Sequence, residues 1–221
     1  MDLIIADIIT KDVVDQLKWD DRVDDSHIRV KVTENHVFLE GYVDSYASKI
    51  AASHDAYLVP GVKHVVNNLE VRLTEPSNAP TDEEVSRKIQ ELLKWNVKID
   101  ASGIEVTTHS GVVTLRGNVS SFWEKFEAED IASHTLGVTG VTNQLGVKVS
   151  KTVVDEEIER DIRNAFERSI LIDESKIIID CSRGEVRISG SVANYAIKRE
   201  ALDIANYTRG VANVIDEITI E

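Results

Sequence analysis

Residues 37–43 read Val-Phe-Leu-Glu-Gly-Tyr-Val, and the same spacing of two valines, an aliphatic residue and a glycine returns twice along the chain. It recurs as Val-Thr-Leu-Arg-Gly-Asn-Val at 113–119 and as Val-Arg-Ile-Ser-Gly-Ser-Val at 186–192. Side chains that alternate between apolar and polar predict a strand with one buried face. Three copies of this strand therefore predict three copies of the structure around it.

The repeat extends over the whole chain. An offset of 76 residues aligns the first copy with the second, and an offset of 73 aligns the second with the third. The aligned sets include Trp19 and Trp95; Asp24, Asp100 and Asp173; Ser26, Ser102 and Ser175; and Lys49, Lys125 and Lys198. This period is too long for a typical solenoid repeat, so each copy is predicted to be a small domain. We expect modules at residues 1–74, 80–149 and 153–221.

Two junctions separate the predicted modules. The first, residues 72–80, contains two prolines and is expected to be an extended spacer. The second, residues 150–154, is shorter, and we expect it to be the stiffer of the two.

Within each copy the hydrophobic pattern changes period. The first segment has apolar residues at helical spacing: Ile9, Val13 and Leu17; Val85, Ile89, Leu92 and Leu93; and Ile158, Ile162 and Phe166. Two alternating runs then predict a hairpin, followed by a second helix at about 45–59, 121–136 and 194–208. A last strand is predicted at 65–71, 141–147 and 214–220. The fold class is therefore α+β: three tandem α-β-β-α-β modules, each a three-stranded mixed sheet with two helices on one face.

Two sets of glycines recur in the alignment. Gly41, Gly117 and Gly190 near the end of the second strand mark either a backbone close to a ligand or a bend that a side chain would crowd. Gly61, Gly137 and Gly210 are predicted to be C-caps of the second helix.

The element order, the Val-x-Leu-x-Gly-x-Val strand, the lysine of the second helix, and the Gly61-Val62 pair followed by Asn67 resemble the BON domain family. In the third copy Ile188 replaces the leucine and Asp216 replaces the asparagine. The resemblance covers essentially the whole chain. The chain is similar to osmotically induced envelope proteins with several BON domains. It implies a non-catalytic protein that binds phospholipid or attaches to a membrane surface.

Charge and composition exclude several other classes. The net charge is −14, and residues 1–75, 76–150 and 151–221 carry −6, −3 and −5. Nucleic-acid binding requires clustered basic residues, so we expect no nucleic-acid partner. No segment approaches the roughly 20 apolar residues that cross a bilayer, and Asp2 is unlike a basic leader. As given, the chain is expected to be cytoplasmic, or periplasmic if a leader has been removed.

No pattern indicates catalysis, a cofactor or a metal. The acids Asp20, Asp21, Asp24 and Asp25 lack the alternating ligands and central glycine of a calcium loop. The six histidines do not recur at matching positions of the repeat. Cys181 alternates with Ile177 and Ile179, which predicts a thiol in the core.

The best binding candidate is one edge of the second module, where the first helix ends and the second begins. This edge is expected to bring together Lys94, Trp95, Lys98, Phe122, Trp123 and Lys125. Indole rings and ammonium groups suit a lipid headgroup region. The alternative is that Trp95 and Phe122 cap the small core and that Trp123 has no role.

Two functions therefore remain open. One is association of the modules with anionic phospholipid. The other is a protein-interaction or stress-protective scaffold in which three weak modules act together.

Overall fold

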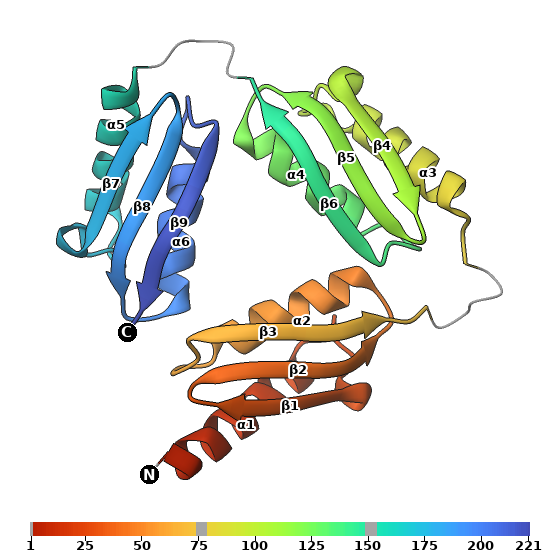
Figure 1. Ribbon diagram of the computed structural model, residues 1–221, viewed down its shortest axis with the longest axis vertical. Helices are drawn as coiled ribbons and strands as arrows, with labels where there is room; N and C mark the ends of the chain where they lie inside the picture. Colours follow the sequence, from red (N-terminus) through yellow and green to blue (C-terminus); the bar gives the residue numbers. More distant parts are fainter. Residues whose placement is uncertain (1, 74–78, 149–153) are drawn as a thin grey trace. The chain divides into compact units, whose positions relative to one another are not determined.

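The computed structural model describes residues 2–73, 79–148 and 154–221, with side chains from residue 5 onward in the first helix. Each of these ranges contains two helices and a three-stranded sheet, and both helices lie on one face of that sheet (Figure 1). The predicted α+β class with three tandem modules is confirmed. Most of both predicted junctions, residues 74–78 and 149–153, lies outside the described residues, so their stiffness and the module boundaries stay predictions.

The three modules repeat one order of elements. The first contains α1 (Asp2–Trp19), β1 (Ile28–Thr33), β2 (His36–Val43), α2 (Tyr46–Leu58) and β3 (His64–Val71). The second contains α3 (Asp82–Trp95), β4 (Ile104–His109), β5 (Val112–Val119), α4 (Phe122–Ser133) and β6 (Gly140–Val147). The third contains α5 (Asp155–Arg168), β7 (Ile177–Ser182), β8 (Glu185–Val192), α6 (Tyr195–Tyr207) and β9 (Asn213–Ile220). A short 3-10 turn precedes the first strand of each module.

The strand that carries the glycine motif is the centre of each sheet. The strand orders are β1-β2-β3, β4-β5-β6 and β7-β8-β9. In the first module β1 runs antiparallel to β2 and β3 runs parallel to it, with Gly41 opposite Ile28 and Leu69. The third module repeats this register, with Gly190 opposite Ile177 and Ile218. The end of the first helix and the start of the second therefore lie at the edge where the central strand ends.

Each core lies between the sheet and its two helices. The predicted helical stripe is buried at Ile9, Val13 and Leu17, and the second helix adds Ala52 and Ala56, both fully buried. Alanines recur at both aligned positions in α4 and α6 and are also fully buried. Small side chains let the second helix lie close to the sheet. One expected core residue was wrong: Leu92 is 37% exposed, and Leu93 takes the buried position.

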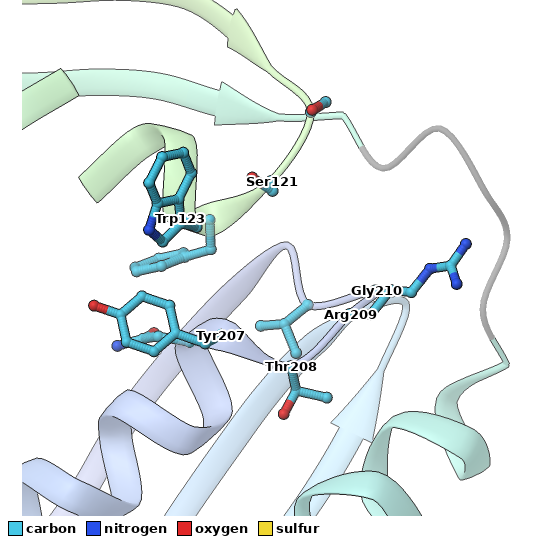
Figure 2. Close-up of a pocket in the computed structure, with 10 residues that line it drawn as sticks. Ser121, Trp123, Tyr207, Thr208, Arg209 and Gly210 are labelled. Atoms are coloured by element: carbon cyan, nitrogen blue, oxygen red, sulfur yellow. The ribbon is translucent and has the colours of Figure 1, made fainter. Parts of the chain in front are cut away.

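The glycine after the second helix does not cap it. The C-cap residues are Val59 after α2 and Thr208 after α6, both with extended backbone. The glycine comes two residues later, in a turn closed by a hydrogen bond from Val62 N to Val59 O of 3.2 Å. Gly61 and Gly210 have φ of 88° and 97°, which suits the third residue of a type II turn. Figure 2 shows Thr208, Arg209 and Gly210 in this turn after α6.

The hairpin turn is fastened differently in the first module. Its central residues have positive φ in every copy, at Glu34 and Asn35, Ser110 and Gly111, and Arg183 and Gly184. In the third module Asp155 at the start of α5 accepts the backbone amides of Arg183 at 2.7 Å and Gly184 at 2.9 Å. Asp82 accepts the equivalent amides in the second module at 2.8 and 2.9 Å. The aligned residue of the first module is Ala6, which has no carboxylate.

The joint between the second helix and the last strand also varies. Asn67 accepts the amide of Leu69 at 3.1 Å and donates to the carbonyl of Lys49 at 2.6 Å. Asn143 repeats both contacts in the second module. Asp216 keeps the first contact, to the amide of Ile218, but a carboxylate cannot donate the second. Lys198 replaces it with an ion pair of 2.8 Å to Asp216, so the departure in the third copy is a compensated exchange.

Candidate functional site

The glycine of the central strand lies against backbone. A Cβ atom on Gly41 would lie 2.0 Å from the carbonyl oxygen of His27, and on Gly190 2.1 Å from that of Lys176. For Gly117 the distance to the carbonyl oxygen of Gly103 is 1.8 Å. All three glycines also have φ between 120° and 140°, where a side chain is strained. The close backbone and the positive φ therefore explain why each central strand has glycine at this position.

The acidic loop of the first module is occupied by local contacts. Asp24 accepts the amide of Ser26 at 3.0 Å and so caps the 3-10 turn before β1. Asp100 and Asp173 make the same contact with Ser102 and Ser175. Because the aspartate recurs in each copy with the same contact, it serves the fold of the turn. Over the described residues, no group of three or more His, Cys, Asp or Glu side chains is arranged to hold a metal ion.

The tip of the second module carries exposed apolar side chains. We define the module 2 tip as residues 94–98, the end of α3 and the loop after it. Trp95 is 84% exposed and Val97 is 97% exposed, while Lys94 and Lys98 are exposed beside them. Exposed tryptophan does not cap a core, so that alternative is wrong for Trp95. Side chains this exposed leave apolar area available for a partner.

The start of α4 supports this tip. The Lys98 ammonium lies 5.6 Å from the centroid of the Trp123 ring, within range of a cation–π contact. Asn96 donates to the carboxylate of Glu127 on α4 at 3.2 Å. Figure 2 shows Trp123 in the first turn of α4, two residues after Ser121. The structure therefore brings Lys98 and Trp123 of the predicted set together.

The remaining predicted residues are less available. Phe122, Trp123 and Lys125 are all partly buried. The backbone carbonyl of Lys125 accepts Asn143 at 2.9 Å, which ties this residue to the joint with β6. Val97 was not predicted, although its sequence signal is plain: it is an apolar residue between Asn96 and Lys98, outside any helical or strand period.

The other modules carry different tips at the same edge. In the first, Trp19 is 82% exposed, and its neighbour Asp20 is held by Arg22 at 2.5 Å. In the third, Ile170 is 99% exposed and Leu171 is 52% exposed. Each module thus exposes apolar side chains where its first helix ends, and only the sequence around the second places lysine on both sides.

Two further sequence predictions can be compared with the structure. Cys181 is buried, as predicted, and burial together with the nearby Asp155 raises the pKa of its thiol to about 12. A thiol with this pKa is unreactive at neutral pH. In the part of the chain that the structure covers, no helix has the length and apolar character to cross a bilayer.

The repeated module defines the class of the protein. A protein-family model described as the BON domain matches residues 6–72, 81–149 and 154–221, and the chain therefore belongs to the BON domain family, as three tandem copies.

Particular relatives include the osmotically-inducible protein Y of Escherichia coli (strain K12). It is 32% identical over 152 residues, which are 66% of this chain and 76% of that protein. An uncharacterized protein of Anaplasma centrale, encoded in the gshII 5' region, is 30% identical over 128 residues, 57% of this chain and 85% of that protein.

Solved structures give no further argument. The chain matches CdsD, a structural protein of the type III secretion system of Chlamydia trachomatis, at 16% identity and a TM-score of 0.28. The match covers 97% of this chain and 92% of that chain. At that TM-score we conclude nothing from the likeness.

Proposed function

We propose that the chain is a non-catalytic binding protein whose second module contacts anionic phospholipid through the module 2 tip. The observation that carries the proposal is the combination of Trp95 and Val97, both almost fully exposed, with Lys94 and Lys98 beside them. Indole and valine side chains suit the headgroup boundary, and ammonium groups suit its phosphates. Osmotic or envelope stress is the proposed setting, because one relative is named as osmotically inducible.

The charge of the whole chain limits the strength of this contact. At −14 the chain gains no long-range attraction to an anionic leaflet, so binding depends on local contacts. A lysine close to an anionic surface contributes about 1 kcal/mol. Burying a large apolar side chain contributes about 1.5–3 kcal/mol. The apolar tip therefore contributes more than either lysine.

Vesicle flotation of the full chain tests the proposal. We expect it to float with phosphatidylcholine vesicles that contain phosphatidylglycerol, and less with phosphatidylcholine alone. Replacing Trp95 by alanine is expected to lower the partition coefficient about tenfold or more, from about 1.5–3 kcal/mol of lost burial. Trp123→Ala is expected to have a smaller effect, since that side chain is partly buried and therefore exposes less apolar area than Trp95.

The chain offers a matched control in Trp19, which is 82% exposed at the aligned position but is followed by Asp20 and Asp21. Trp19→Ala is expected to leave flotation nearly unchanged. Equal losses for Trp19→Ala and Trp95→Ala would contradict a dominant second module. Absence of flotation with either vesicle would contradict lipid binding and favour the scaffold function.

A further inference from the structure

The first module contains a buried carboxyl group at a position where the other two modules have isoleucine. Asp55 lies on the buried side of α2 and is only 2% exposed. Within the described parts of the chain, no hydrogen-bond partner reaches its Oδ2 atom. The aligned residues are Ile131 and Ile204, so packing at this position does not require a polar side chain. An ionised carboxylate buried in this way is costly.

The groups around Asp55 do not neutralise it. Asp20, in the loop after α1, faces Asp55, and its side chain is only 11% exposed. Arg22 is committed to Asp20, at 2.5 Å between Nη2 and Oδ2, and its own side chain is 68% exposed. The other neighbours are Gln16 of α1 and His54, whose Nδ1 lies 4.0 Å from Asp55 Oδ1.

Two adjacent carboxyl groups that share one guanidinium favour holding a proton between them. Burial is the largest cause that raises the pKa of Asp55, followed by the charge of Asp20, and together they bring it to about 6. Arg22 lowers the pKa of Asp55 but does not offset these two effects. The hydrogen bonds of Arg22 hold the pKa of Asp20 well below its usual range, so the proton resides on Asp55.

We propose that Asp55 and Asp20 form a proton-binding site which fastens α1 to α2 in mildly acidic conditions and loosens this contact as the pH rises. A second contact joins α2 to the loop that follows Trp19, because the hydroxyl of Ser48 donates to the carbonyl of Arg22 at 2.8 Å. The first module is thereby a pH-responsive element of the chain. This proposal does not depend on lipid binding.

The sign of the effect follows from linkage. The pKa of Asp55 in the folded module lies above its usual value of 3.8, so its stabilisation is complete below that value. The stabilisation is lost as the pH rises through about 6. Between pH 5 and pH 7, values of 3.8 and about 6 predict about a tenfold rise in the opening equilibrium of the first module.

Hydrogen exchange of the full chain, resolved by peptide and corrected for intrinsic rates, tests this effect. We expect protection of α1 and α2 to fall about tenfold from pH 5 to pH 7. The helices α3 and α4, where Ile131 stands in place of Asp55, serve as the internal reference in the same sample. In Asp55→Asn, which keeps the shape and removes the charge, protection is expected to be the same at both pH values.

Two outcomes would overturn the proposal. One is a wild-type chain whose first module shows no more pH dependence than the reference helices. The other is a dependence that persists in Asp55→Asn, since it would then belong to another group such as His54. A carboxyl carbon NMR titration of wild-type Asp55 gives an independent check, and a midpoint below pH 4.5 would also overturn the proposal.

Discussion

The first and third modules share their register residue by residue, yet they are fastened by different polar contacts. Asp155 holds the hairpin turn of the third module where the first has Ala6. Asp216 and Lys198 form an ion pair where the first module uses the amide of Asn67. The comparison separates positions fixed by backbone geometry from polar contacts that can be exchanged between copies. We expect a substitution at a position fixed by backbone geometry to have the same effect in both modules. We expect a substitution in one of the polar contacts to have an effect that differs between modules.

The largest expected effect is at the glycine of the central strand. Gly41→Ala and Gly190→Ala are both expected to lower the free energy of unfolding of their own module by about 3 kcal/mol or more, from steric overlap and positive φ together. The Cβ atom would meet a backbone carbonyl, which has little freedom to move. Peptide-resolved hydrogen exchange of the full chain measures the loss module by module.

The two unsubstituted modules in each variant are the control. If Gly190→Ala left the third module as protected as before, while Gly41→Ala opened the first, the shared constraint would be refuted. The close approach would then be adjustable in the third copy.

The second prediction exchanges the hairpin contact between modules. Asp155→Ala is expected to lower protection of the β7–β8 hairpin, because the amides of Arg183 and Gly184 lose their acceptor. Ala6→Asp is expected to raise protection of the β1–β2 hairpin by creating the same acceptor beside Glu34 and Asn35. Both effects should be smaller than that of glycine. A loss at Asp155 without a gain at Ala6 would show that the contact is not transferable.

The third prediction uses the opposite pH dependences of the modules. Hydrogen bonds from backbone amides hold the pKa of Asp82 and Asp155 below 3.8. Their contribution is therefore present above about pH 4 and lost as the pH falls further. Protection of the second and third hairpins should fall below pH 4. Asp155→Asn should remove this step from the third module and leave it in the second. A step that survives in the third module of this variant would have to come from other acids.

The sequence predicted the order of helices and strands well, because apolar residues recur with the period that is typical of each kind of element. Alternation and helical spacing located the α-helices and strands of each module but not the 3-10 turns, and small residues at Ala52 and Ala56 indicated the helix face on the sheet. The glycine after the second helix was misread because a type II turn and a glycine cap use the same positive φ. Gly61 is two residues beyond the actual cap.

Side-chain environments were harder to predict. Asp55 gave no periodic signal, since a charged residue in an alanine-rich helix is usually exposed. Its burial could have been inferred from the isoleucines at 131 and 204 in the alignment. At the candidate site, the sequence predicted that Trp95, Lys94 and Lys98 lie at one edge, and all three are exposed there. It could not tell that Trp123 is partly buried, because that depends on tertiary packing, which the repeat pattern does not specify.

The smallest expected effect tests the joint between α6 and β9. Asp216→Asn restores the residue of the first two copies, keeps the acceptor for the amide of Ile218, and adds a donor for the carbonyl of Lys198. The ion pair that it removes is partly exposed and is worth about 0–1 kcal/mol. We therefore expect little net change in protection of α6. Lys198→Met removes both the ion pair with Asp216 and the hydrogen bond from Lys198 Nζ to the carbonyl of Ile218, so it should cost more than Asp216→Asn. If the double variant Lys198→Met with Asp216→Asn is no more stable than Lys198→Met alone, the two residues are not coupled and the compensated exchange is refuted.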